Sequence, residues 1–363
     1  MRVKLGDVCE RGTSNLKLSD VSEKNGEFSV FGASGYIGSV DFYQQGYPYV
    51  AVVKDGAGIG REMLCPGKTS VIGTMQYLLP KDNILPKYLF YVVKYMNLEK
   101  YFTGATIPHI YFKDYKNEEF NFDFWERQVE IVSVLSKCEK VIDLCKQELQ
   151  LLDKLIKARF VEMFGDVIHN SKKWQVCLFA EITSSRLGKM LDAKQQTGRN
   201  SYPYLANFNV QWFRFNLENL NKMDFDEKDR AEFELREGDL LVCEGGEIGR
   251  CAVWHNELQP CFFQKALHRV RCNHQIILPD YLAWWFRYNC DYGGFSALAG
   301  AKATIAHLPG AKLKQLQVAV PPMELQEQFA VFVAQTDKSK VAVQKALDEA
   351  QLLFDSLMQE YFG

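Results

Sequence analysis

Several features are missing from this chain of 363 residues. It has no apolar run long enough to span a membrane, and its polar opening, residues 1–7, predicts no secretory signal peptide. Its ten cysteines include no C-x-x-C pair, and its six histidines are not at ligand spacing with them. We therefore expect neither a disulfide framework nor a metal site, but the reduced cysteines of a cytosolic protein.

A basic charge excess is missing as well. The formal net charge is −2 for the whole chain, 0 for residues 1–125 and +2 for residues 166–323. A protein that holds DNA by itself usually shows a basic stripe. Composition therefore does not indicate nucleic acid, and a DNA function must rest on other features or on partner proteins.

The motifs of a self-sufficient enzyme are absent too. Residues 56–60, with glycines at 56, 58 and 60, resemble a dinucleotide-binding loop, but no helix pattern follows and no βαβ unit surrounds them. We interpret this stretch as a structural turn rather than a cofactor loop. No adenine methyltransferase motif, Walker loop or nuclease carboxylate cluster is found, which disfavours a chain that carries out catalysis alone.

What the chain does have is an internal repeat. A gapless shift of 198 residues aligns Ala105-Thr106-Ile107 with Ala303-Thr304-Ile305, and Glu126-x-Gln128 with Glu324-x-Gln326. A shift of 189 residues aligns the glycine turn that ends in Arg61 with the one that ends in Arg250. The changing shift indicates insertions in a globular unit, and the constant shift indicates a packed helix. The sequence is therefore one module repeated, a globular part followed by a long helix.

The apolar positions after residue 130 predict the first long helix. They alternate in steps of three and four residues, as in a coiled-coil seam: Leu135, Cys138, Ile142, Cys145, Leu149, Leu152 and Ile156. We predict one helix over 126–163 and its copy over 324–361, where Thr336 and Lys340 weaken the seam. Two seams of equal length favour an antiparallel coiled coil over two helices buried separately in globular cores.

The segments before the helices are predicted to be mixed and mostly β. Strands separated by turn glycines are expected at 28–31, 49–53, 71–79, 239–243 and 266–270, and short helices at 87–98 and 280–288. The predicted fold class is α+β with pseudo-two-fold internal symmetry. Its parts are two globular domains and two helical segments, at 1–125, 126–165, 166–323 and 324–363.

Two histidines, His109 and His307, occupy equivalent places in the two copies. A recurring histidine can order a loop, contact DNA or act as a catalytic base. No nucleophile repeats beside either histidine, which disfavours the catalytic role. Loop ordering and a DNA contact both remain open.

Several short motifs follow one another in a fixed order along the chain, and the closing motifs and helix starts occur in both copies. They are Leu5-Gly6-Asp7-Val8, the segments 31–38 and 53–60, the closing motifs Thr103-Gly104-Ala105-Thr106 and Gly300-x-x-Ala303-Thr304, and the two helix starts at Glu126 and Glu324. In this order they resemble the specificity subunit of type I restriction-modification enzymes over essentially the whole chain. The first copy departs from the family at residues 122–125, where the family favours proline.

The resemblance implies a non-catalytic subunit that reads DNA. Two target recognition domains, 1–125 and 166–323, would each read one half of a bipartite asymmetric site in double-stranded DNA. The paired helices would set the unread spacer and dock two modification subunits, which bring S-adenosylmethionine for adenine methylation. Restriction subunits, where present, would add translocation and cleavage with ATP and Mg. The resemblance implies no catalytic residue, metal or cofactor on this chain, and a cytoplasmic protein without a membrane partner.

Loops of the two domains are expected to carry the base readout. Arg61 and Arg250 are the strongest candidates, because they recur after the same glycine turn. The candidate DNA-contacting residues of the first domain are Lys54, Arg61, Lys68, Thr69, Ser70, Thr106 and His109. Those of the second domain are Arg250, Gln264, Lys265, Arg269, Lys302, Thr304 and His307.

Two other functions stay open. The chain could be the specificity subunit of a related system, such as a type IIB restriction enzyme or a phage-defence methylation complex. It could also be a coiled-coil scaffold whose globular ends bind protein. Association with a methyltransferase distinguishes the first possibility from the second.

Overall fold

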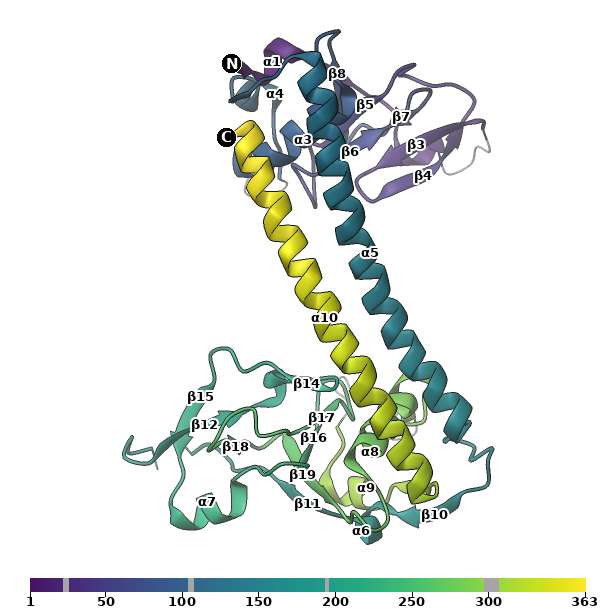
Figure 1. Cartoon of the computed structure of the whole chain (residues 1–363), viewed down its shortest axis with the longest axis vertical. Helices are drawn as coiled ribbons and strands as arrows, with labels where there is room; N and C mark the ends of the chain where they lie inside the picture. The colour runs from purple at the N-terminus through teal and green to yellow at the C-terminus, as the bar shows by residue number, and fades with distance from the viewer. Residues whose placement is uncertain (22–25, 104–107, 193–195, 297–306) are drawn as a thin grey trace. The chain divides into compact units, whose positions relative to one another are not determined.

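The computed structural model describes residues 1–21, 26–103, 108–192, 196–296 and 307–363 (Figure 1). The chain divides into two compact units. The first contains Met1–Leu149 and Ala342–Gly363, and the second contains Gln150–Val341. Each unit therefore holds one globular domain and a section of each long helix.

The first unit is built on a four-stranded sheet of order β2-β8-β5-β6, a three-stranded sheet of order β4-β3-β7 and a ribbon of β1 with β9. The interior strand β5 consists of five buried residues, Tyr-Val-Ala-Val-Val, because both of its faces are covered. The strands are β1 (Arg2–Lys4), β2 (Cys9–Thr13), β3 (Phe28–Gly32), β4 (Gly35–Val40), β5 (Tyr49–Val53), β6 (Glu62–Cys65), β7 (Ser70–Val71), β8 (Met75–Pro80) and β9 (Glu119–Asn121). The helices are α1 (Leu5–Val8), α2 (Leu18–Val21), α3 (Pro86–Met96), the 3-10 turn Leu98–Tyr101 and α4 (Phe112–Tyr115).

The second unit repeats this topology. Its sheets have the orders β11-β19-β16-β17 and β15-β12-β18, and β10 pairs with β20, while a short hairpin of β13 and β14 is additional. The strands are β10 (Gln175–Leu178), β11 (Thr183–Leu187), β12 (Ser201–Leu205), β13 (Val210–Gln211), β14 (Arg214–Phe215), β15 (Asn221–Asp224), β16 (Leu240–Cys243), β17 (Cys251–Val253), β18 (Phe262–Phe263), β19 (Leu267–Cys272) and β20 (Gln317–Val320). The helices are α6 (Phe179–Ile182), the 3-10 turn Asn207–Asn209, α7 (Glu227–Phe233), α8 (Pro279–Asp291) and α9 (Gly310–Lys314).

Strand directions match between the two domains as well. In the first domain β3 pairs antiparallel with β4 and parallel with β7. In the second domain β12 pairs antiparallel with β15 and parallel with β18. The internal repeat predicted from the sequence is therefore confirmed.

The two long helices are α5 (Trp125–Phe164) and α10 (Met323–Phe362), each of 40 residues. In the first unit, early residues of α5 share a core with late residues of α10: Ile131, Leu135 and Ile142 with Phe354 and Met358. In the second unit the order is reversed, and the ring centroids of Phe160 and Phe329 are 5.5 Å apart. This pairing is antiparallel, so the predicted coiled coil and the α+β fold class are confirmed.

The positions predicted to form the seam lie in the interface between the two helices, and the two polar ones on α10 form hydrogen bonds there. All seven predicted seam positions of α5 are buried or half-buried. On α10, Thr336 is buried and its hydroxyl donates to the carbonyl of Phe332 at 2.9 Å. Lys340 directs its ammonium group to Asp153 on α5, at 2.7 Å. The two polar positions thus satisfy their hydrogen bonds instead of adding apolar contact.

A buried glutamine joins each long helix to its domain. The Oε1 atom of Gln128 accepts from the backbone N–H of Leu85, and its Nε2 donates to the carbonyls of Asn83 and Asp123. Leu85 precedes α3 and has no side chain that could cap that helix. The start of α5 is therefore fixed to the start of α3.

One predicted strand was wrong. The stretch 71–79 is two strands, β7 and β8, which belong to different sheets. A turn separates them, in which the N–H of Met75 donates to the carbonyl of Ile72 at 2.9 Å, and the N–H of Gly73 donates to Leu16 at 2.7 Å. Continuous β-forming residues on either side concealed this turn. None of the described helices is long and apolar enough to cross a membrane.

Candidate nucleic-acid interface

The glycine turn of the first domain is a tight hairpin between β5 and β6. The N–H of Gly60 donates to the carbonyl of Val53 at 2.8 Å, and the N–H of Val53 donates to Arg61 at 2.9 Å. Gly60 has φ of +80°, and a Cβ atom there would lie 2.4 Å from the backbone nitrogen of Glu99. The glycines are thus required by the backbone, and the stretch has no helix behind it that could bind a dinucleotide.

His109 holds this hairpin in place. Its Nδ1 atom lies 2.6 Å from Oδ1 of Asp55, and its backbone pairs with Thr103. Burial disfavours ionisation of Asp55, but hydrogen bonds from Lys54 and His109 outweigh it, so that the pKa of Asp55 is lowered. The histidine therefore orders the loop, which is one of the two roles that the sequence left open. A DNA contact by its exposed ring edge stays a prediction.

The second domain builds the same arrangement with different side chains. His307 pairs with Gly245 in the loop between β16 and β17, and the N–H of Leu308 donates to the carbonyl of Glu244 at 2.6 Å. The ring of His307 packs on Gly245, where a Cβ atom would come within 3.2 Å of it. Equivalent hairpins thus present Asp55 in one domain and Glu244 in the other.

The two recurring arginines have different environments. Arg61 is exposed, and its Nη1 atom donates to the carbonyl of Ala33 at 3.2 Å. The side chain of Arg250 is only 18% exposed, and its Nη2 atom donates to the carbonyl of Asn207 at 3.0 Å. Arg250 also lies 3.7 Å from the carboxylate of Glu247. Arg61 can therefore reach a ligand with most of its guanidinium, whereas Arg250 is engaged within its own domain.

Three further candidates of the first domain lie together before β8. Lys68 is exposed, with φ of +57°. Thr69 and Ser70 are 4% and 0% exposed. The Thr69 hydroxyl donates to the carbonyl of Pro66 at 2.7 Å, and the Ser70 hydroxyl accepts from the N–H of Gln44 at 2.9 Å. Lys54, finally, forms an ion pair with Asp55. Of this group only Lys68 presents a free charged end to solvent.

In the second domain, the turn between β18 and β19 contains two candidates. Gln264 begins the turn and Lys265 is exposed at its corner. Arg269 follows in β19, where its Nη1 atom donates to the carbonyl of Glu232 at 2.6 Å. Burial lowers the pKa of Arg269, with a further contribution from Arg271. Thr106, Lys302 and Thr304 lie outside the described residues.

Some exposed residues were not predicted from the sequence. Tyr36 and Tyr47 of the first domain are 62% and 86% exposed. Arg186, Met190 and Lys228 of the second domain line a groove together with Lys265. The groove residues come from three separate segments, 186–190, 228–233 and Lys265, so no local pattern groups them. Only the basic and aromatic residue types themselves hint at such a surface.

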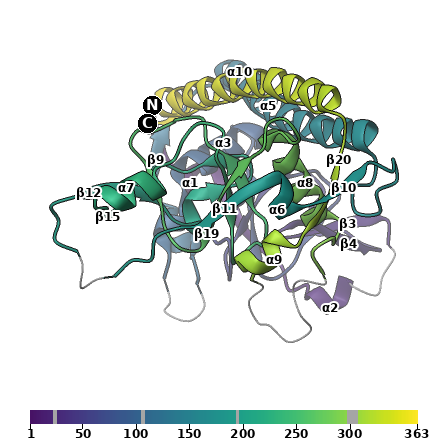
Figure 2. The same cartoon turned by 90° about the horizontal axis from the view of Figure 1, so that it is seen from below.

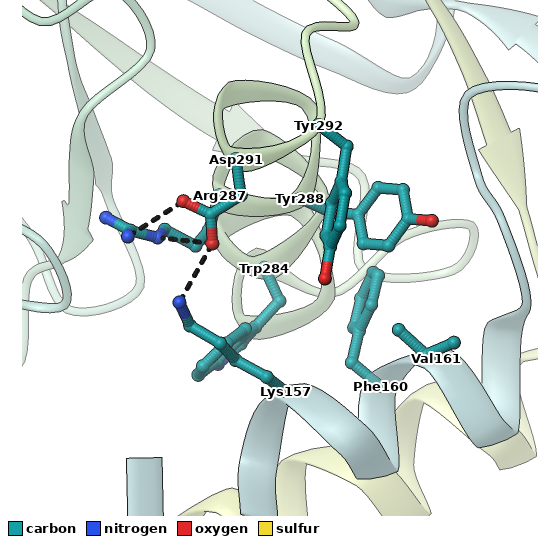
Figure 3. Close-up of a pocket in the computed structure, with 8 residues that line it drawn as sticks. All are labelled: Lys157, Phe160, Val161, Trp284, Arg287, Tyr288, Asp291 and Tyr292. Carbon is teal, nitrogen blue, oxygen red and sulfur yellow. Dashed lines mark hydrogen bonds and ion pairs between the residues drawn. The ribbon is translucent and has the colours of Figure 1, made fainter. Parts of the chain in front are cut away.

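A hollow beside α5 and α8 is a structural contact and not a candidate nucleic-acid site. Figure 3 shows Lys157 of α5 and Arg287 of α8 both directed at the carboxylate of Asp291. Lys157 lies 2.9 Å from it and the Nη2 atom of Arg287 lies 2.8 Å away. The rings of Phe160 and Tyr288 pack at 5.9 Å. The charges are satisfied locally, so this contact fastens α5 to α8. Among the described residues, no group of His, Cys, Asp and Glu side chains is arranged to hold a metal ion.

Comparisons with known proteins agree with this architecture. The sequence model described as "Type I restriction modification DNA specificity domain" matches residues 1–154 and 171–350. The MjaX type I restriction enzyme specificity subunit of Methanocaldococcus jannaschii is 23% identical over 176 residues, which are 47% of this chain and 41% of that protein. The MjaIX specificity subunit of the same organism is 28% identical over 93 residues, 24% of this chain and 22% of that protein. The matches thus span less than half of these relatives.

Solved structures extend the likeness in fold to the whole chain. The crystal structure of a type I restriction-modification S subunit from M. genitalium has a TM-score of 0.64 at 14% identity, covering 100% of this chain and 96% of the other. A structure of a type I restriction-modification system, solved to explain complex assembly and conformational transition, has a TM-score of 0.54 at 14% identity, with 99% and 97% covered. Since the family model covers both domains and most of both helices, the chain belongs to the family of the type I restriction modification DNA specificity domain.

Proposed function

We propose that this chain is the DNA-recognition subunit of a type I restriction-modification complex. Each domain reads one half of a bipartite asymmetric site in double-stranded DNA. The observation that carries the proposal is the duplicated hairpin. The same backbone, closed by His109 in one copy and His307 in the other, presents different side chains in the two domains. One backbone scaffold with two sets of side chains fits a protein that recognises two different DNA half-sites.

The helices of the coiled coil supply docking surfaces for partner subunits. Beside its seam, α5 carries exposed aliphatic side chains at Val134, Val141 and Leu144 in the first unit, and at Leu151 and Leu155 in the second. Their spacing of seven, three, seven and four residues forms a second apolar stripe at heptad spacing. Such a stripe on a soluble protein marks an interaction surface. We assign it to a helix of a modification subunit, of which the complex would hold two.

The chemistry belongs to the partners in this proposal. The modification subunits bring S-adenosylmethionine and methylate adenine, and restriction subunits, where present, use ATP and Mg for translocation and cleavage. The chain itself contributes recognition, with no catalytic residue of its own. Because the substrate is the DNA of the cell, the complex works in the cytoplasm.

Co-expression with a methyltransferase subunit and sequencing of methylated adenines test this function. The expected result is a complex of one chain with two methyltransferase subunits, and a two-part methylated motif that disappears when the chain is omitted. Methylation by the chain alone would contradict the non-catalytic role. If the chain fails to bind a methyltransferase subunit, a protein-binding scaffold would be favoured.

A further inference from the structure

A groove in the second domain lies between the end of β11, the helix α7 and the turn before β19. Figure 2 shows α7 near β12 and β15 at the edge of this domain. The residues that line the groove are Arg186, Leu187, Gly188, Lys189, Met190, Lys228, Asp229, Glu232, Phe233 and Lys265. Four of them are cations and two are anions, so the lining has an excess of positive charge.

The floor of the groove is held by backbone hydrogen bonds. The N–H of Gly188 donates to the carbonyl of Leu267 at 3.0 Å, and the N–H of Lys265 donates to the carbonyl of Lys189 at 2.8 Å. A Cβ atom at Gly188 would lie 2.3 Å from the carbonyl oxygen of Gln264, so the two segments are in close contact there. The side chains on this floor therefore project from a fixed frame.

The four cations of the groove differ in how far they are already paired. Lys189 is bound internally, because its ammonium group donates to the carbonyl of Asp224 at 2.8 Å and pairs with Asp229. Arg186 pairs with Glu232 but keeps 54% of its side chain exposed. Both Lys228 and Lys265 are exposed, and neither forms an ion pair among the described residues. The two free lysines thus face an opening whose anions are already neutralised.

The turn that carries Lys265 is strained. Ala266 has φ of +86°, a backbone conformation that glycine adopts more easily. The N–H of Leu267 donates to the carbonyl of Gln264 at 3.2 Å, which closes a four-residue turn with Lys265 at its first corner. Backbone strain of this kind is found where a structure must present a particular side chain.

The first domain lacks a cation at two positions equivalent to the groove residues. The equivalent turn joins β7 to β8, and there Gly73 occupies the position of Lys265. The strand equivalent to β11 is β2, in which Gly12 occupies the position of Arg186. The basic lining at these two positions is therefore not repeated in the described part of the first domain.

We propose that this groove binds the phosphate backbone of duplex DNA, with Lys228 and Lys265 as its phosphate contacts and Arg186 at its rim. This inference rests on the proposed function. Two unpaired lysines, one on the floor and one on α7, suit phosphates, which need positive charge without base discrimination. The groove would then position the second domain on DNA, and loops elsewhere in that domain would read the bases.

The test measures DNA affinity of the full chain in complex with its modification subunits, over a series of salt concentrations. The variant is Lys228→Gln with Lys265→Gln, and the probes are two duplexes of unrelated sequence. The expected result is weaker binding to both probes, and a plot of log affinity against log salt that is shallower by about one unit for each lysine. Thermal unfolding of the variant verifies its fold.

A matched control removes two exposed cations of the same domain that lie outside the groove, Arg214→Gln with Lys222→Gln. Its salt dependence should equal that of the unaltered chain. If the groove variant keeps the full slope, or if both variants lose the same amount, the groove assignment is overturned while the proposed function stands. If the unaltered complex binds neither probe, the proposed function itself fails, and the groove with it.

Discussion

Gln128 and Gln326 stand 198 residues apart and make the same three hydrogen bonds. Gln326 accepts from the N–H of Leu278 at 2.8 Å, as Gln128 does from Leu85 at 2.9 Å. The Nε2 atom of each donates to two backbone carbonyls. Both side chains are fully buried. The repeated glutamine thus fixes the start of each long helix to the short helix of its own domain, a joint that any docking on the long helices depends on.

Replacing Gln128 by alanine should therefore be costly. It leaves the N–H of Leu85 and two carbonyls without their partner, and we expect a loss of about 2–4 kcal/mol in the free energy of unfolding. Gln147→Ala is the matched control, because Gln147 is exposed on the same helix. Urea unfolding measures both variants. Equal stability of the two would show that the buried bonds contribute nothing.

Substitutions at Arg61 and Arg250 should separate an effect on DNA binding from an effect on folding stability. Arg61→Ala should change the free energy of unfolding by no more than about 0.5 kcal/mol and should weaken DNA binding, because the side chain is exposed. Arg250→Ala should cost about 1–2 kcal/mol, because it removes a charged donor from the carbonyl of Asn207. Thermal unfolding and DNA titration measure the two effects. A reversed order, with Arg61 the structural residue, would contradict the roles read from their environments.

His268 should make the second domain sensitive to acid. It is buried, and its Nε2 atom lies 2.9 Å from the carbonyl of Leu308. Burial lowers the pKa of His268, although the bond to Leu308 and the charge of Glu244 oppose this. An unfolded histidine has a pKa of about 6.5, so below that pH the unfolded state takes up a proton that the folded state excludes.

Stability should therefore fall as the pH falls from about 6.5 toward the lower folded pKa, and this histidine should have no effect above that window. His268→Gln should flatten the pH dependence of stability, because glutamine does not titrate. Glutamine suits this position, since Gln76 occupies the equivalent place in the first domain and donates to Tyr115. Urea unfolding over a pH series measures it. An undiminished acid dependence in the variant would assign the effect to other groups.

The strained turn predicts a stabilising substitution. Ala266→Gly should relieve the positive φ and raise the free energy of unfolding by up to about 1 kcal/mol. Ala346→Gly, on the exposed face of α10, should lower it by about 1 kcal/mol, as glycine does within a helix. Differential scanning calorimetry of both variants compares them. A loss of stability in Ala266→Gly would mean that the turn is not strained.

The parts of this structure that local patterns determine were predictable. The seam from Leu135 to Ile156 defined α5 to within two residues, because a heptad pattern fixes both the helix and its buried side. The turn before Arg61 was predictable because three glycines at 56, 58 and 60 leave few alternatives.

Features that depend on tertiary contacts were not predictable. The turn at Gly73 was hidden between two β-forming stretches and depends on a bond to Leu16 from another part of the domain. The engagement of Arg250 depends on Asn207, 43 residues earlier. The groove collects Arg186, Lys228 and Lys265 from three segments, and no spacing in the sequence unites them.

A domain exchange tests most directly whether the two globular domains read DNA independently of each other. The globular domain at residues 1–125 is replaced by that of another member of the family with a known DNA site, and methylated adenines are mapped in cells that contain the matching modification subunit. Independent recognition by the two domains predicts a two-part motif in which one half changes to the half-site of the donor and the other half stays the same. A motif that changes in both halves, or in neither, would contradict two domains that read DNA independently.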